Sequence, residues 1–133
     1  MAEKLLVSIE EIGEGAELIN RLNSDLPIKA AFWLRLADEA NWSLYLSSDQ
    51  LTAKSVRHGY ELVWHAYCNT KHAILESSQI KLLEPNHPFV SAVVKLRDKN
   101  DWIGMIHHNG PYLADQSIEG AIIYPSKMPI KLH

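Results

Sequence analysis

Three histidines recur at intervals of seven in the stretch RHGYELVWHAYCNTKH. These are His58, His65 and His72, and Glu61 and Cys68 lie between them. Imidazole, carboxylate and thiolate groups bind zinc, and they also serve as the bases and nucleophiles of hydrolases. Residues seven apart on one straight helix are separated by roughly 10 Å along its axis, so the three histidines cannot share one ion. Glu61 with His65, or His65 with Cys68, could each supply two ligands, and the others would have to come from elsewhere.

The same stretch has the periodicity of an amphipathic helix, which we expect over roughly residues 51–68. Five bulky residues fall on one side of this helix and are predicted to face the core: Val56, Tyr60, Val63, Trp64 and Tyr67. The histidines, Glu61 and Cys68 fall on the other side and are expected to face water. The HExxH pattern of zinc proteases is absent. We therefore predict that the protein binds no metal and no other cofactor. The alternative is a metal- or thiol-dependent hydrolase that uses Glu61, His65 or Cys68.

The other elements complete a predicted α+β fold. Apolar and polar residues alternate over residues 28–36 and 42–47, which predicts a β-hairpin. The capping box Ser8-x-x-Glu11 begins a helix. Further segments are a strand over residues 79–84, a helix after residue 86, and strands over 102–107 and 118–124. The order α-β-β-α-β-α-β-β predicts a single mixed or mostly antiparallel sheet, with helices packed mainly on one face. We expect one domain over residues 1–133, since there is no repeat and no linker.

The pairing of the hairpin decides which side chains share a face. Setting Leu34 opposite Leu44 also sets Trp33 opposite Tyr45, on the face away from the apolar alternation. Lys29 and Arg35 would lie on that second face as well. If helices cover mainly the other side, this face is open, and an open tryptophan between cations needs a binding partner. The predicted binding residues are therefore Lys29, Trp33, Arg35 and Tyr45.

The composition of the chain limits the kinds of partner that it can bind and indicates its cellular compartment. The net charge is -3, so no overall positive field draws the chain to nucleic acid or to an anionic membrane. No apolar run reaches the length of a membrane span or of a signal peptide. The single cysteine excludes an internal disulfide and fits a reducing compartment. We expect a cytoplasmic protein with no membrane partner.

Two stretches resemble sequences of small bacterial proteins of no assigned activity. They are PIKAAFWLRLADEANWSLYLSS, in the predicted hairpin, and IEGAIIYP, near the last strand. The shared feature is core alternation with tryptophans, so the resemblance implies a shared α/β fold and no activity, cofactor or catalytic residue.

The residues favour a non-catalytic protein that associates with itself or with a protein partner through the aromatic and basic face. Trp, Tyr and Arg are enriched in protein interfaces, and most soluble oligomers pair identical chains. Single-stranded nucleic acid binding is an alternative use of the same face, because bases stack on aromatic rings and phosphates attract cations. The acidic net charge makes it the less favoured one.

Overall fold

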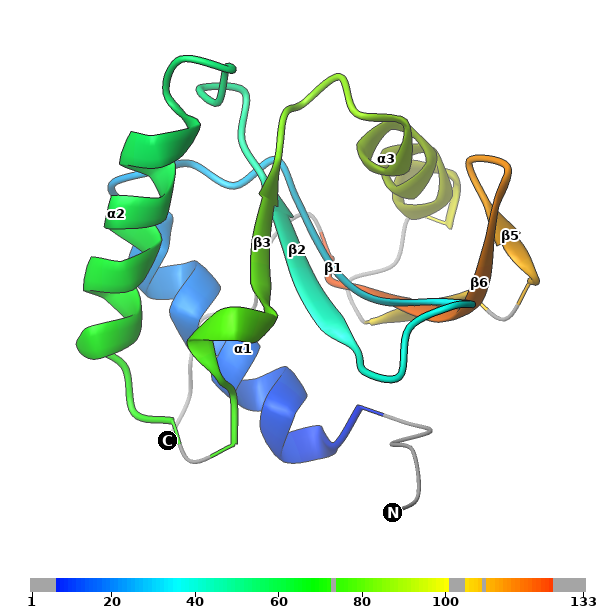
Figure 1. Ribbon diagram of the computed structural model, residues 1–133, viewed down its shortest axis with the longest axis horizontal. Helices are drawn as coiled ribbons and strands as arrows, with labels where there is room; N and C mark the ends of the chain where they lie inside the picture. Colours follow the sequence, from blue (N-terminus) through cyan, green and yellow to red (C-terminus); the bar gives the residue numbers. More distant parts are fainter. Residues whose placement is uncertain (1–6, 73, 101–104, 109, 126–133) are drawn as a thin grey trace.

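The computed structural model describes residues 7–72, 74–100, 105–108 and 110–125, and these form an α+β fold with a six-stranded mixed sheet (Figure 1). In chain order the elements are α1 (Ile9–Leu22), β1 (Ala30–Leu36), β2 (Ser43–Ser47), α2 (Val56–Cys68), the 3₁₀ turn η1 (Ser77–Gln79), β3 (Ile80–Leu83), α3 (Pro88–Asn100), β4 (Ile106–His108), β5 (Tyr112–Leu113) and β6 (Gln116–Ile123). The predicted α+β class is confirmed, and the short β5 is an addition. Part of the strand predicted over residues 102–107 lies outside the described residues.

The strands lie side by side in the order β3-β2-β1-β6-β4, and β5 pairs with β6. β2 and β3 run parallel, whereas the other pairings are antiparallel. The chain crosses between the two parallel strands through α2, as parallel strands require a long connection. The prediction of a mixed, mostly antiparallel sheet is therefore correct. β3 forms one edge of this sheet.

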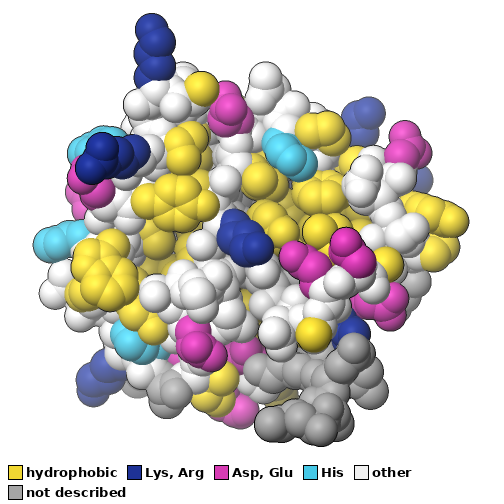
Figure 2. Space-filling view, viewed as in Figure 1, with side chains coloured by type: hydrophobic (Ala, Val, Ile, Leu, Met, Phe, Trp, Pro, Cys, Tyr) yellow, Lys and Arg dark blue, Asp and Glu magenta, His cyan; other side chains and the backbone are white. Residues whose placement is uncertain are grey.

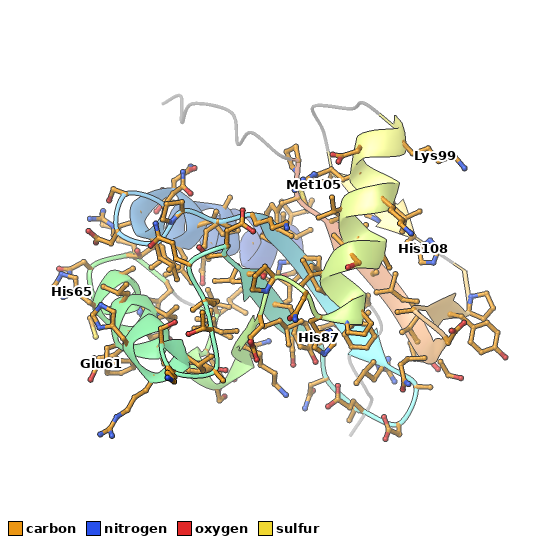
Figure 3. The ribbon with its side chains drawn as sticks, turned by 90° about the horizontal axis from the view of Figure 1, so that it is seen from above. Glu61, His65, His87, Lys99, Met105 and His108 are labelled. Carbon is orange, nitrogen blue, oxygen red and sulfur yellow. The ribbon has the colours of Figure 1, made fainter. Side chains whose placement is uncertain are left out.

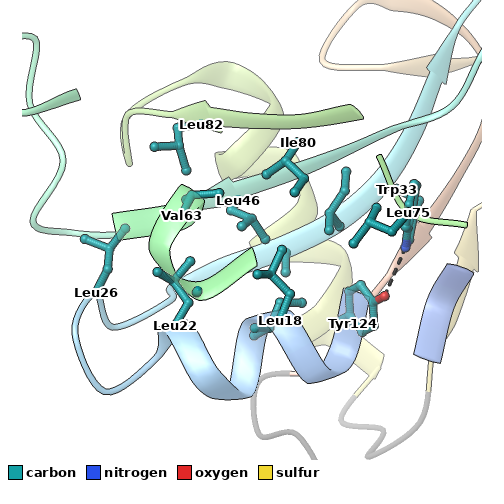
Figure 4. Packing of buried hydrophobic residues seen from close by; sticks show 14 of the residues in the cluster. Leu18, Leu22, Leu26, Trp33, Leu46, Val63, Leu75, Ile80, Leu82 and Tyr124 are labelled. Carbon is teal, nitrogen blue, oxygen red and sulfur yellow. Dashed lines mark hydrogen bonds between the residues drawn. The ribbon is translucent and has the colours of Figure 1, made fainter. Parts of the chain in front are cut away.

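Helices cover both faces of the sheet. α1 and α2 lie on one face and α3 lies on the other (Figure 1). The side chains of β1 alternate between two apolar clusters, as the pleat of a strand requires. Trp33 joins Leu18, Leu22, Leu46 and Val63 under α1 and α2 (Figure 4). Phe32 and Leu34 join Val90 and Val93 under α3. The helices were expected to pack mainly on one face, and α1 and α2 do share a face. α3 was not expected on the opposite face.

The hairpin of β1 and β2 pairs one residue away from the predicted register. Trp33 lies opposite Leu44, and Phe32 lies opposite Tyr45. The connection is longer than expected: Glu39 N–H donates to the Leu36 carbonyl in a turn, and β2 begins only at residue 43. A shift of one residue sends a side chain to the other face of the sheet. Trp33 and Tyr45 therefore point to opposite faces.

One buried hydrogen-bond chain ties α1 to the centre of the sheet. The indole Nε1 of Trp33 donates to the Tyr124 hydroxyl at 3.0 Å, and that hydroxyl donates to the Ile12 carbonyl at 2.7 Å. Gly15 makes room for the contact, because a Cβ at that position would lie 2.5 Å from the Tyr124 oxygen. Burial raises the pKa of Tyr124, and the hydrogen bond from Trp33 lowers it by a smaller amount. The buried indole N–H of Trp33 and the hydroxyl of Tyr124 thus both have hydrogen-bond partners.

Candidate functional site

Three of the residues predicted to form an open face are buried, and they are divided between the two faces of the sheet. Trp33 has no exposed surface, Arg35 is 5% exposed and Tyr45 is 6% exposed. Trp33 packs under α1 and α2, while Tyr45 stacks on Phe32 on the α3 side with ring centroids 5.5 Å apart. The prediction of one open surface formed by these residues is wrong for two reasons. Helices cover both faces, and the changed register separates the two aromatic rings.

Arg35 and Lys29, the two predicted cations, have local partners. The Nε of Arg35 donates to the Glu39 carbonyl at 3.0 Å, which holds the turn between β1 and β2. Lys29 stays partly exposed, and its ammonium lies 3.2 Å from a carboxylate oxygen of Asp49. Burial, followed by the negative charge of Glu39, raises the pKa of Tyr45. Of the four predicted binding residues, Lys29 alone keeps a side chain that a partner can reach.

The histidine row of α2 faces water, as expected. His58, Glu61, His65 and Cys68 are all exposed, and Glu61 and His65 point outward from α2 (Figure 3). The Nδ1 atom of His58 lies 3.4 Å from the Glu61 carboxylate, an exposed i,i+3 pair. Across the described residues, no three His, Cys, Asp or Glu side chains are grouped so that they could hold a metal ion. The geometry therefore gives the hydrolase alternative through Glu61, His65 and Cys68 no support.

Two further histidines have structural partners and lie far from α2 (Figure 3). The Nδ1 of His87 accepts the backbone N–H of Phe89 at 3.0 Å, at the start of α3. The Nε2 of His108 lies 3.0 Å from the Tyr112 carbonyl, between β4 and β5. Each imidazole thus satisfies a backbone group of its own loop, which explains both positions without a catalytic role.

The helix α2 is rotated relative to the sequence-based expectation, and this exposes aromatic rings. Tyr60 is 41% exposed and Trp64 is 57% exposed, although both were predicted to face the core. The buried positions of α2 are instead Gly59, Val63 and Ala66. A Cβ at Gly59 would lie 2.7 Å from a methyl carbon of Leu51 and 3.0 Å from one of Leu82, so α2 comes close to the core through its small residues. Because the backbone of α2 lies close to the core at its small residues, the large side chains Tyr60 and Trp64 lie at the side of the helix.

We call Tyr60, Trp64, Tyr67 and His72 the aromatic face of α2. The ring of Trp64 stacks on Tyr67 with centroids 5.8 Å apart, and Tyr67 stacks on His72 at 3.9 Å. Tyr60 lies one helical turn before Trp64 on the same side of the helix. Figure 2 shows apolar side chains gathered over α2, on the left of the view. Sequence reasoning assigned Tyr60, Trp64 and Tyr67 to the core and placed His72 on the water-facing side. The signal that it missed is the pair of small residues, Gly59 and Ala66.

Hydrogen bonds at two tyrosines fix the aromatic face in place. The Tyr67 hydroxyl donates to the Leu75 carbonyl at 2.7 Å, and partial burial raises the pKa of this phenol. The Tyr60 hydroxyl accepts the backbone N–H of Leu82 at 3.0 Å. The contacts tie the exposed ring of Tyr60 and the partly buried ring of Tyr67 to the segment around β3. The rings therefore form a largely preorganised surface rather than a set of free rotors.

Exposed charges flank the aromatic face. Arg57 lies two turns before Trp64 on the same side of α2, and Lys71 follows the end of the helix. Over residues 54–72 the sequence holds three Lys or Arg residues and one Glu, whereas the whole chain has a net charge of -3. This surface is thus the more basic part of an acidic molecule.

Comparison with protein-family models, with curated proteins and with solved structures finds no match. The resemblance to small bacterial proteins therefore stays a prediction. Among the described helices, none combines the length and the hydropathy that crossing a lipid bilayer requires.

Proposed function

We propose that the protein is a non-catalytic binding domain that docks an acidic protein partner on the aromatic face of α2. The observation that carries this proposal is the exposure of Trp64, at 57%, within the ring stack that includes Tyr67 and His72. Trp and Tyr dominate the binding energy of protein interfaces because they bury a large area and lose little side-chain entropy. We also propose a cytoplasmic location, since Cys68 is the single cysteine and is exposed.

The charges support an acidic partner rather than a second copy of the chain. A two-fold pairing through the aromatic face would bring the same surface of two copies together. Arg57 lies near one end of this surface and Lys71 follows the end of α2, so the cations of one copy would lie near those of the other. Like charges that face each other weaken an interface and select against it. A partner with acidic residues around an apolar centre would instead meet opposite charges.

Single-stranded nucleic acid is the second candidate partner. A stack of three rings beside Arg57 and Lys71 resembles the platforms on which bases stack. Glu61, which lies on the same helix and is exposed, and the net charge of -3 disfavour a polyanion. Protein is therefore the favoured class.

Site-specific crosslinking in cells tests the proposal and identifies the partner in the same experiment. A photoreactive p-benzoylphenylalanine replaces Trp64 in one variant and Tyr112 in a matched control, since Tyr112 is an aromatic residue 61% exposed on β5. We expect position 64, and not position 112, to crosslink one recurrent acidic protein. A product that contains two copies of the chain would instead show self-association, and equal products from both positions would contradict the proposal.

Binding measurements on the purified pair then decide the role of the aromatic face. Trp64→Ala is expected to weaken binding about thirtyfold or more, the loss typical of a central interface tryptophan. Arg57→Glu should also weaken it, and Tyr112→Ala should not. Titration with labelled single-stranded DNA and RNA at about 50 and 200 mM salt tests the alternative, because nucleic acid binding falls steeply with salt. Salt-dependent binding that Trp64→Ala removes would replace the protein partner by nucleic acid.

A further inference from the structure

A cavity of about 300 Å³ lies away from the aromatic face, where the end of α1, the start of β1 and the last turns of α3 meet. Lys29, just before β1, and Arg97, in α3, line it together with Asn20 in α1 and Asn23, the C-cap residue of α1. None of the described residues that line it is acidic. The chain as a whole holds 16 acidic and 13 basic residues. The cavity is therefore a local positive site on an acidic molecule.

The guanidinium of Arg97 is held in position before any ligand arrives. Its Nη1 donates to the Lys29 carbonyl at 2.7 Å, and its Nε lies 3.3 Å from a carboxylate oxygen of Asp98. The Arg97 side chain is only 12% exposed. A fixed and partly desolvated guanidinium binds carboxylate and phosphate oxygens better than a mobile one.

The end of α1 contributes donors rather than acceptors. The Oδ1 of Asn23 accepts the Ile28 N–H at 2.7 Å, so the part of the amide left for a ligand is the NH₂ group. The last carbonyls of a helix usually repel anions. Here the Ile19 carbonyl already accepts the Asn23 N–H at 2.9 Å, and the Leu22 carbonyl accepts the Leu26 N–H at 2.8 Å. These hydrogen bonds reduce the repulsion that an anion would meet.

The apolar part of the cavity lining is small. It is formed by Ile19, Ala31 and Tyr124, which are buried and expose little surface, whereas most of the exposed lining is polar. Converging polar groups beside a small apolar surface suit a ligand that carries one anionic group on a compact body. We propose that this cavity binds a small organic anion whose carboxylate or phosphate group meets Lys29 and Arg97 and whose compact body lies against this apolar part.

The present ion pairs of the two cations do not block such a ligand. Lys29 pairs with Asp49, whose side chain is 75% exposed, and Arg97 pairs with Asp98, whose side chain is 64% exposed. Ion pairs with such exposed partners contribute little because water and salt screen them. An oxyanion that enters the cavity can therefore take over both cations.

Amide-resolved NMR titrations of the full chain test this site with four probes. Benzoate and phenyl phosphate carry both a charged group and an apolar body, whereas inorganic phosphate lacks the body and benzyl alcohol lacks the charge. We expect saturable shifts at residues 29–31 with the first two probes and weaker binding of the other two. The ratio of benzoate to phenyl phosphate affinity tells which oxyanion the site prefers.

Three variants with the same loss of charge locate the binding. Arg97→Gln and Lys29→Gln are each expected to weaken benzoate or phenyl phosphate binding at least about tenfold. Lys95→Gln, an exposed position on α3 outside the cavity lining, should leave it unchanged. If Arg97→Gln fails to fold, Lys29→Gln carries the test, because Lys29 contacts an exposed partner. Trp64→Ala should bind the probes normally, which separates this site from the aromatic face.

Two results would overturn the inference. One is the absence of saturable shifts with either aromatic anion at millimolar concentration. The other is equal weakening in Lys95→Gln and Lys29→Gln, which would show attraction by overall charge rather than a built site.

Discussion

The phenolic oxygen of Tyr60 lies 3.0 Å from the backbone nitrogen of Leu82 and accepts its N–H. Leu82 belongs to β3, the edge strand of the sheet, and its N–H points away from β2. The exposed edge of a sheet has unpaired backbone groups, and a strand of another chain can form hydrogen bonds with them. The neighbouring Ile80 N–H donates to the Ser77 carbonyl in η1. The aromatic face of α2 thus also protects the edge of the sheet.

Removing the Tyr60 hydroxyl should open this edge locally. Tyr60→Phe keeps the ring but leaves the Leu82 N–H to water, so the free energy of unfolding should fall by about 0.5–1.5 kcal/mol. Hydrogen exchange should accelerate at Leu82 more than at residues of β1. Tyr112→Phe, at an exposed position on β5, is the control and should change neither quantity. Unaltered exchange at Leu82 would mean that the contact does not protect the strand.

Two glycine substitutions in helices should have opposite effects on stability. Gly59→Ala forces Leu51 and Leu82 to move, so we expect a loss of about 1–3 kcal/mol despite the better helix propensity of alanine. At Gly13 in α1 nothing lies within 4 Å of an added Cβ, so Gly13→Ala should gain up to about 1 kcal/mol. Chemical denaturation of both variants measures this. A stabilised Gly59→Ala protein would show that α2 does not pack closely through this residue.

Tyr124 should make the protein sensitive to alkali. Burial raises the pKa of this phenol above its usual value of 10.0, so the folded state keeps the proton at a pH where the unfolded chain releases it. Stability from this group is complete below about pH 10 and falls as the pH rises further, by up to about 1.4 kcal/mol per pH unit. Tyr124→Phe should therefore flatten the dependence of the unfolding free energy on pH above 10. Tyr45 and Tyr67 have pKa values raised in the same direction, so part of the slope should remain.

The same variant has a cost at neutral pH. Tyr124→Phe leaves the buried Nε1 of Trp33 without its acceptor, which should lower the free energy of unfolding by about 1–3 kcal/mol. Thermal or urea unfolding at pH 7 measures this loss. An unchanged slope above pH 10 together with this loss would mean that the phenol ionises equally in both states.

His87 should act as the N-cap of α3. Its imidazole accepts the Phe89 N–H through Nδ1 at 3.0 Å. We expect His87→Ala to lose about 0.5–2 kcal/mol of stability and His87→Asn to keep most of it, since asparagine is a good N-cap residue. Urea unfolding at neutral pH compares the three proteins. Equal losses in the two variants would assign the imidazole a packing role instead.

Local signals in the sequence predicted most of the elements. The capping box of α1 forms as expected, with the Ser8 hydroxyl and the Glu11 carboxylate each accepting a backbone N–H at 3.1 Å. The short strand β5 was not predicted, because its turn places Ala114 and Asp115 at positive φ without the glycine that usually marks such a turn. The strands of the first hairpin were correct, but their pairing depended on a turn length that alternation does not specify.

The candidate site was harder to predict than the fold. Helical periodicity placed Trp64 and Tyr60 in the core, because it assumes that the largest apolar side chains are buried. In the structure the small residues Gly59 and Ala66 face the core, and burial of the backbone there leaves the rings outside. The exposure of His58, His65 and His72 was predicted correctly from helical periodicity. The prediction that the face of Trp33 is open was wrong, because the side of the sheet that α1 and α2 cover depends on contacts between residues far apart in the chain.

Because β6 lies between β1 and β4, the sheet can be completed only after the ribosome has made the β6 segment. β1 is among the first strands to leave the ribosome, yet one of its two neighbours consists of residues 116–123. Until that segment emerges, Trp33 lacks the Tyr124 acceptor and half of β1 has no backbone partner. The nascent chain therefore carries an unfinished sheet while residues 37–115 are made, and completion of this sheet waits for one long-range pairing.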